Sequence, residues 1–490
     1  MNTSPMKCTR LLLPGALVLA LAACASSRGL QPQGHLLDAD SLHSNRALAA
    51  APLSAAGFPA ADWWRALGDP QLDALVAEGL RSSPSLEAAD ARLRQAQAQA
   101  AGANAERKPS LALSPGYTGL TLPKSMAGNL GGDYMGSVQA VANFSYGIDL
   151  WGGKRANWEA AVDSGHAAAV DAQAARLDLS AAIVQTYVQL AHAGQLQRVA
   201  NDELARAEKT LELTQQRRRA GIDSNLQVTQ AQARLPLARQ QQLAAQQQID
   251  SARNALAALL GQGPDRGLDI TVPAELNPLA LQLPSVLPSE LLGRRPDIVA
   301  ARWRVEAADK QIKVAKTRFY PSLNLTALGG VVSKNLDNLL QSGSTFGLLA
   351  PALSLPIFDG GRLRAGLASS DADYDLAVAS YNHTVVESLR DVADQVAALR
   401  SLGEQVQAQQ QAQATAQAAN DLAQQRYRAG IGNYLDVLST QDQLLRSQQQ
   451  LSNLQSQQLL SSVRLSAALG GGFQPDATAE PAAVTAHSNS

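Results

Sequence analysis

The chain has 490 residues, of which 46% are hydrophobic and only 4% aromatic, and its formal net charge is −1. This near-neutral balance gives no electrostatic reason to expect nucleic acid or an anionic membrane surface as a partner. Ala and Gln fill long tracts of the sequence, and these small or amide side chains favour long, closely packed helices over compact cores of bulky groups.

The N-terminal end has the pattern of an export signal. Two basic residues precede an apolar run over residues 11–23, which is too short to span a bilayer. The run ends in Leu-Ala-Ala-Cys, which resembles a bacterial lipobox. We therefore expect residues 1–23 to be a signal peptide and Cys24 to be lipidated. The alternative is ordinary signal cleavage, in which Cys24 has no special role. Since Cys8 is removed with the signal peptide, only one cysteine remains and no internal disulfide is expected.

The next segments predict a tether, a helix and a β-hairpin. Residues 24–61 are rich in Ser, Pro, Gly and Ala, which is typical of a tether. A helical pattern covers about 62–108 and stops before Pro109, because proline cannot continue a helix interior. Strict apolar–polar alternation predicts a strand over about 136–150, and weaker alternation predicts one over about 110–122. A Gly-rich loop joins the two strands, so a hairpin is the simplest interpretation.

Helical periodicity then returns for a long stretch. We expect one helix over about 153–218, which would be about 100 Å long, and a shorter one over about 224–260. Between them stands Arg-Ala-Gly, in which Gly221 can supply the positive φ that ends a helix. This turn predicts the tip of an antiparallel helical hairpin. Several prolines within residues 266–288 predict an irregular connection.

The same order of elements repeats, so the chain reads as two tandem copies over residues 62–265 and 289–472. The second copy predicts an opening helix, strands over about 321–332 and 344–358, a long helix over about 361–428 and a shorter one over about 434–469. Pro351 and Pro356 fit the last strand only at an edge or a bulge. Residues 473–490 are predicted to be a disordered tail.

The two tips are near-copies of each other. Residues 213–235 align without a gap with residues 422–444, and both contain Arg-x-Arg-Ala-Gly-Ile. Within the second long helix, apolar residues step 4-3-4-3, which predicts a coiled-coil seam. These residues are Val385, Leu389, Val392, Val396 and Leu399.

Four strands cannot close a barrel, because about eight are needed even for a filled interior. Amphipathic strands of an exported, lipidated protein must nonetheless avoid an open edge in lipid. We therefore expect several protomers to share one barrel, with three copies supplying twelve strands and the long helices forming a second, helical tube in the periplasm. The alternatives are a soluble sandwich with one face packed on helices, and a structural coiled-coil lipoprotein that forms no pore.

No catalytic residue, cofactor or metal site is expected. The six His residues are scattered without ligand spacing. Asp371-x-Asp373-x-Asp375 resembles the start of a calcium loop but lacks its Gly and distal Glu, so a solvated helix face is the simpler interpretation. A near miss to a phosphate loop at residues 147–155 fits a hairpin-to-helix turn better, since the second copy has a matching Gly-Gly-Arg.

Four motifs are specific enough to support a family resemblance. They are Arg-Tyr-Arg-Ala-Gly-Ile-Gly-Asn-Tyr-Leu-Asp-Val-Leu (426–438), Gly-Arg-Arg-Pro-Asp-Ile (293–298), Tyr-Pro-Ser-Leu (320–323) and Ser-Tyr-Gly-Ile-Asp-Leu-Trp-Gly-Gly-Lys (145–154). With these, the chain from about Asp62 to Gly472 resembles the TolC-type outer-membrane efflux factors, particularly their lipoprotein (NodT-like) branch. The resemblance implies a homotrimer, a twelve-stranded barrel, and a periplasmic helical tunnel that docks an adaptor protein bound to an inner-membrane pump.

The resemblance also assigns two roles to the tips. Residues of both Arg-x-Arg-Ala-Gly turns are expected to engage the adaptor: Arg217, Arg219, Gly221, Arg426, Arg428 and Gly430. Tyr427 and Asp436 are expected to narrow the periplasmic entrance of the closed tunnel. The first copy carries Arg218 and Gln227 at the matching positions, and Gly432 stands where related tunnels can carry an Arg, so fewer charged contacts are expected to hold the closed state. Alternatively, Asp436 merely caps the positive end of a helix dipole.

The function expected from this resemblance is a passive conduit for small toxic compounds or drugs. It would lie in the outer membrane, anchored by lipid at Cys24, and take its driving energy from the pump. The alternative within transport is a type I protein-secretion conduit, against which the lipobox argues mildly.

Overall fold

The computed structural model describes residues 27–38, 41–42, 58–121, 123–128, 132, 134–277 and 293–474. The expected signal peptide, Cys24 and the tail beyond residue 474 therefore lie outside the described residues. The chain divides into two compact units, and each unit combines pieces of both sequence repeats. None of the described helices has both the length and the apolar character that crossing a membrane requires.

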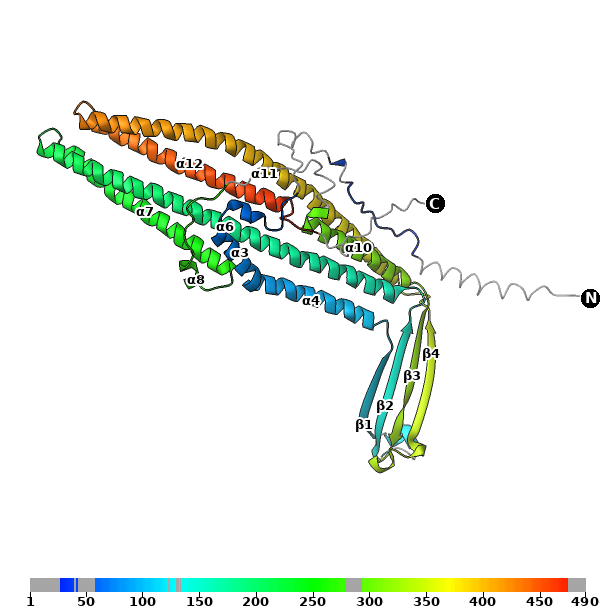
Figure 1. Cartoon of the computed structure of the whole chain (residues 1–490). Coiled ribbons are helices and arrows are strands. Elements are labelled where there is room, and N and C mark those ends of the chain that lie inside the picture. Colours follow the sequence, from blue (N-terminus) through cyan, green and yellow to red (C-terminus); the bar gives the residue numbers. More distant parts are fainter. Residues whose placement is uncertain are drawn as a thin grey trace, which may run out of the picture. The chain divides into compact units, whose positions relative to one another are not determined.

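The first unit contains a single antiparallel sheet in the order β1-β2-β3-β4 (Figure 1). Its strands are β1 (Ser110–Thr121), β2 (Tyr134–Ile148), β3 (Ser322–Ser333) and β4 (Thr345–Ser354). Each repeat supplies one hairpin, and β2 pairs with β3 from Val138↔Ser333 to Ile148↔Leu323. Since β1 and β4 are edges, Pro351 needs no ladder partner for its missing N–H. The expected extension of the last strand to residue 358 is wrong, because β4 ends at Ser354 before Pro356.

The long helices have equal lengths in the two repeats. The helices α6 (Gly153–Arg219) and α11 (Arg362–Arg428) have 67 residues each, about 100 Å at 1.5 Å per residue. Each turns back at a tight loop into a 35-residue helix, α7 (Asn225–Leu259) or α12 (Tyr434–Ala468). In the predicted seam of α11, Leu389 is half-buried and the other four residues are buried. The duplication is thus present in the structure as well as in the sequence.

The expected opening helix of the first copy is divided in three. A 3₁₀ turn η3 (Trp63–Leu67) ends at Gly68 with φ 79°, α3 (Pro70–Ser82) follows, and α4 (Pro84–Ala105) begins afresh. Proline at the first position of α3 and α4 favours a new start, because its missing N–H is unpaired there anyway. The counterpart of α4 is α10 (Pro296–Thr317), which is also 22 residues long.

Short elements occupy the connections. The predicted irregular connection begins with a brief helix, α8 (Asp265–Leu268), and its residues 278–288 lie outside the described part. The hairpin loops carry α5 (Lys124–Ala127) and the 3₁₀ turns η5 (Leu336–Asn338) and η6 (Ser342–Ser344).

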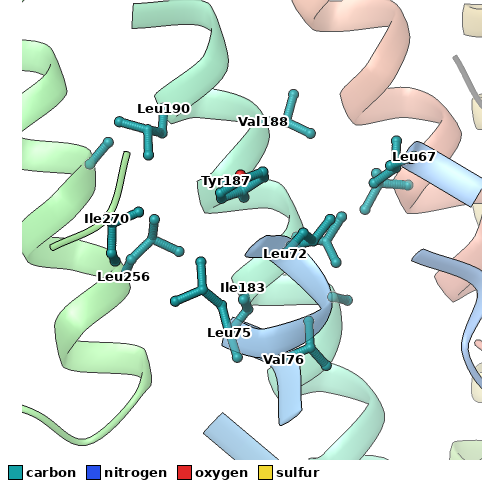
Figure 2. Close-up of a cluster of buried hydrophobic side chains, with 14 of the residues drawn as sticks. Leu67, Leu72, Leu75, Val76, Ile183, Tyr187, Val188, Leu190, Leu256 and Ile270 are labelled. Carbon is teal, nitrogen blue, oxygen red and sulfur yellow. The ribbon is translucent and has the colours of Figure 1, made fainter. Parts of the chain in front are cut away.

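Despite its few aromatic residues, the chain builds a compact hydrophobic cluster in the second unit (Figure 2). α3, α6, α7 and the segment after α8 contribute to it, with Leu72, Ile183, Leu256 and Ile270 at most 1% exposed. Tyr187 lies at its centre, and its hydroxyl donates to Asp69 Oδ2 at 2.7 Å. Burial, reinforced by this bond, raises the pKa of Tyr187 far above its usual range. The cluster fixes α3 against the middle of α6.

The predicted tether is ordered and docked over residues 27–38. Its even-numbered residues from 30 to 36 are half-buried, and Leu30 packs on Ile312, Ala315 and Leu367 of α10 and α11. The N–H groups of Gln33 and Gly34 both donate to Asp375 Oδ1, at 2.8 and 2.6 Å. Composition did not indicate this docking because backbone groups make the polar contacts. We call residues 27–38 the strap.

The strap also corrects the expectation of a solvated aspartate face. Asp373 is exposed as expected. Asp375, however, accepts hydrogen bonds from the strap, and Asp371 is only 6% exposed. Neither carboxylate oxygen of Asp371 has a hydrogen-bond partner among the described residues. Spacing i, i+4 places Asp371 and Asp375 on one face of α11, and Asp373 falls outside it.

Candidate functional site: the paired helical tips

Both tips have the same backbone. Gly221 and Gly430 take φ values of 73° and 80°, in the left-handed region that ends a helix. The N–H of Ile222 donates to the carbonyl of Arg217 at 2.9 Å, and the N–H of Ile431 donates to that of Arg426 at 3.0 Å. The predicted glycine-ended turns are therefore confirmed in both copies.

The helices that leave the two turns are capped differently. Ser224 caps α7, and the side chain of Gln227 reaches back to the Ser224 N–H at 3.0 Å. Asn433 caps α12 by accepting the N–H of Leu435 at 3.1 Å. Asp436, which corresponds to Gln227, is exposed in the first turn of α12. Gln227 thus completes a capping box, whereas the Asp436 carboxylate stays at the surface, where the helix dipole favours it.

A buried polar contact ties one tip to the other. Arg217 Nε lies 3.0 Å from Asp223 Oδ2, and its Nη1 donates to the carbonyl of Tyr427 at 2.7 Å. The Tyr427 hydroxyl donates to the same oxygen of Asp223. The guanidinium also stacks over the Tyr427 ring, 4.3 Å from its centre. We call Arg217, Asp223 and Tyr427 the tip tie, since it joins the α6–α7 turn to the end of α11.

The tip tie is a buried ionic contact whose charge is kept by its hydrogen bonds. The side chains of Arg217 and Asp223 are 10% and 7% exposed, and Tyr427 is 2% exposed. Burial lowers the pKa of Arg217, but the hydrogen bond and charge of Asp223 outweigh it and leave the pKa raised. Burial, aided by the bond to Asp223, also raises the pKa of Tyr427. The arginine therefore stays charged and the tyrosine stays a donor at neutral pH.

A second tyrosine backs the tip tie. The rings of Tyr427 and Tyr434 lie 5.7 Å apart, and both pack with Ala231 and Val437. Burial raises the pKa of Tyr434 to about 12, and its hydroxyl has no hydrogen-bond partner among the described residues. Tyr434 therefore acts here as an apolar packing group.

The two expected gate residues are not brought together. Tyr427 is buried in the tip tie, whereas Asp436 is exposed and makes no described side-chain contact with it. Asp223 was missed by sequence reasoning, although comparing the two copies could have found it. It stands where the second tip has Gly432. A Cβ at Gly432 would lie 2.8 Å from the backbone nitrogen of Tyr427, so that position has no room for a side chain.

The outer surface of the tips is apolar and basic. The exposed apolar residues occupy matching positions in the two copies, and they are Ile222 (61%), Leu226 (63%), Ile431 (72%) and Leu435 (56%). Arg219, Arg426 and Arg428 are also exposed. Among the described residues, the side chains of Arg219 and Arg428 bond only within their own helices, at 3.4 Å. Of the four arginines expected to dock a partner, only Arg217 faces inward.

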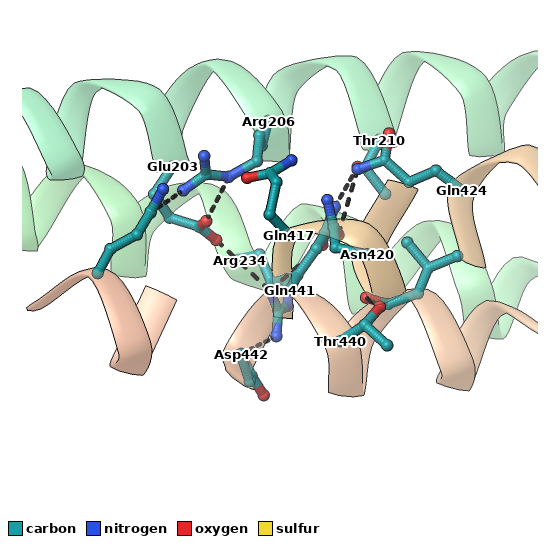
Figure 3. A network of polar contacts seen from close by, with 12 residues as sticks. Glu203, Arg206, Thr210, Arg234, Gln417, Asn420, Gln424, Thr440, Gln441 and Asp442 are labelled. Carbon is teal, nitrogen blue, oxygen red and sulfur yellow. Dashed lines mark hydrogen bonds and ion pairs between the residues drawn. The ribbon is translucent and has the colours of Figure 1, made fainter. Parts of the chain in front are cut away.

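A second polar network lies further along the same helices (Figure 3). Arg234 of α7 lies 3.5 Å from Glu203 Oε1 of α6 and also pairs with Asp442 of α12. Arg206 binds the other oxygen of Glu203 at 3.1 Å. Burial raises the pKa of Glu203, and the two arginines oppose that rise. The second repeat has Ala412 and Gln443 at the positions that match Glu203 and Arg234, so it cannot form this network.

The described residues contain no group of three His, Cys, Asp or Glu side chains that could hold a metal ion. The chemistry that the tips offer is recognition, by exposed apolar and cationic side chains, together with the ionic contacts that hold the two hairpins in register.

Comparisons with known protein families, sequences and structures all match outer-membrane proteins. The family model "Outer membrane efflux protein" matches residues 75–262 and 287–471. The chain is 37% identical to the fusaric acid resistance protein FusA of Burkholderia cepacia over 76% of its own length and 71% of that protein. It is 30% identical to the multidrug resistance outer membrane protein MdtP of Escherichia coli, over 86% and 88%. The crystal structure of the outer membrane protein VceC from Vibrio cholerae matches with a TM-score of 0.77 and 38% identity, covering 85% of this chain and all of that one.

Proposed function

Because this chain belongs to the outer membrane efflux protein family and is an outer-membrane efflux channel, we propose that it is the passive conduit through which a pump expels small toxic compounds. FusA and MdtP carry names that refer to fusaric acid resistance and multidrug resistance. The sequence holds no nucleotide-binding fingerprint, so the driving energy comes from an inner-membrane pump joined through a periplasmic adaptor. We propose no catalytic role.

One observation carries the proposal: the four-stranded sheet has two open edges and exposed apolar side chains. Leu111 and Leu113 of β1 are 74% and 69% exposed, and Leu349 and Leu353 of β4 are 66% and 70% exposed. Neither an open edge nor so much apolar surface suits an isolated chain in water. Three copies that pair β1 of one with β4 of the next would close twelve strands into a barrel.

The test is to count the copies and to measure transport. Native mass spectrometry of the purified protein in lipid nanodiscs should detect three chains per particle. The same protein in planar bilayers should conduct ions, and its gene should restore drug resistance to a strain that lacks its own channel. Particles with a single chain, or bilayers that stay closed, would contradict the proposal.

The tips support docking of the adaptor. The matching apolar pairs surround the exposed Arg219, Arg426 and Arg428, and such a surface fits a partner with complementary apolar and acidic groups. Gly221 and Gly430 shape both turns. Arg217 serves docking indirectly, because it holds the two tips in one register through the tip tie.

Both residues expected to gate the entrance belong to the second repeat. We propose that Asp436, exposed at the start of α12, narrows the entrance with negative charge contributed once per protomer. Tyr427 contributes through the tip tie, by holding the end of α11 against the first tip. Opening the entrance would require these buried contacts to move or break.

We also propose that Cys24 is lipidated, which places the chain in the lipoprotein branch of the family and anchors it to the outer membrane. The tetrapeptide Leu-Ala-Ala-Cys supports this.

A further inference from the structure

The strap has a defined direction along α11. Arg364, in the first turn of α11, donates to the carbonyl of Arg28 at 3.2 Å. Further along the strap, Gly34 reaches Asp375, and the N–H of Leu37 donates to Asn382 at 2.8 Å. The N-terminal end of the strap therefore lies where α11 begins, which is the end of that helix that follows the sheet.

An exposed apolar segment lies at that same junction. Between the last residue of β4 and the first of α11, Leu355, Ile357 and Phe358 are 53%, 57% and 72% exposed. We call these three residues the ledge. Nothing in the described part of the chain covers it, and an apolar surface of this kind marks a contact with another apolar group.

The length of the missing chain limits what reaches the ledge. Cys24 precedes Ser27, the first described residue of the strap, by three residues, and three residues span at most about 11 Å. The acyl chains on a lipidated Cys24 are long and apolar, so burying them against apolar side chains is favourable. The strap thus holds its lipidated end close to the ledge.

We propose that the ledge seats the acyl chains of the lipidated Cys24, and that Asp375 is the positioning residue that holds the strap in the register this requires. The inference rests on the proposed lipidation of Cys24. It also assigns a side to the helices: the face of α10 and α11 beneath the strap lies on the outside of the tube, away from the tunnel lumen.

Asp375 is suited to positioning because its carboxylate accepts two strap N–H groups, and hydrogen bonds to a charged acceptor are stronger than neutral ones. Asp373 offers a matched control. It lies two residues away on the same helix, carries the same charge, and is exposed outside the strap contact.

The experiment is photo-crosslinking in the lipidated, membrane-embedded protein. p-Benzoylphenylalanine replaces Phe358, cells are fed alkyne-tagged palmitate, and mass spectrometry identifies what the irradiated residue joins. We expect it to join the acylated N-terminal peptide. The same amino acid in place of Leu340, which is 91% exposed in the β3–β4 loop, should not. Asp375→Ala should lower the yield roughly tenfold, and Asp373→Ala should leave it unchanged.

The outcomes separate this inference from the proposed lipidation. If Cys24 carries label but position 358 joins only free phospholipid, the ledge is not its seat and the inference fails while the anchor stands. If the yield is unchanged in Asp375→Ala, the positioning role is wrong. If Cys24 carries no label at all, the anchor fails and this inference fails with it.

Discussion

Removing the carboxylate of the tip tie should release the two tips from each other. In Asp223→Ala, the guanidinium of Arg217, only 10% exposed, loses its counter-ion, and the Tyr427 hydroxyl loses its acceptor. Breaking a buried ion pair from one side costs about 3–5 kcal/mol. Since about 1.4 kcal/mol is a factor of ten, the population of tied tips should fall at least about a hundredfold. Tyr427→Phe removes one bond to a charged acceptor, worth about 1.5–3 kcal/mol, so in this variant the population of tied tips should fall at least about tenfold.

Spin labels on the exposed residues Arg219 and Arg428 would measure the separation of the tips by pulsed electron resonance. In trimers that contain one doubly labelled protomer, the wild-type protein should give one narrow distance distribution, and Asp223→Ala a broad one extending to longer distances. Arg218→Ala is the control, because Arg218 is exposed and, in the described part of the chain, bonds only to Asn225 of its own tip, at 2.6 Å. An unchanged distribution in Asp223→Ala, or an equal broadening in Arg218→Ala, would refute the tip tie as the contact that holds the hairpins together.

Four further changes have definite expected results. Burial raises the pKa of the Asp371 carboxyl, so the folded protein binds the proton of this group more tightly than the unfolded chain does. The folded protein therefore loses stability as the pH rises through the raised pKa. Asp371→Asn should therefore stabilise the protein by about 1 kcal/mol at pH 7.5, with the gain vanishing below about pH 3; superimposable melting curves at all pH values would count against this. Asp436→Ala should raise single-channel conductance in planar bilayers, and identical traces would remove Asp436 from the gate. Gly430→Pro forces a φ of about −65° where the turn needs 80°, so it should abolish drug resistance without blocking trimer assembly; a mutant that still restores resistance would exclude the docking role. Cys24→Ala should eliminate labelling with palmitate, and unchanged labelling would disprove lipidation at that residue.

The elements that sequence predicted well are those specified by local chemistry. Gly221 and Gly430 end their helices because only glycine adopts positive φ without strain. The seam from Val385 to Leu399 is buried because its period matches a helix packed along its length. The edge position of Pro351 follows from its missing donor.

The features that sequence did not predict depend on residues brought together from distant positions. Asp223 meets Tyr427 across 204 positions, and Arg234 meets Asp442 across 208. No periodic pattern marks such pairs, because each partner is an ordinary polar residue in its own segment. The docked strap was hidden for another reason, since Gln33 contributes only its backbone N–H.

The strap also sets an order of events during export. It lies near the N-terminus and is exported before most of the chain, yet its partner Asp375 follows Gly34 by 341 positions. Contacts of such long sequence separation form late, because the entropy of closing the intervening chain must be overcome first. The strap therefore emerges early and docks late, after about half of the second repeat has crossed the inner membrane. Until then, the N-terminal end of the chain travels without the helix that later holds it.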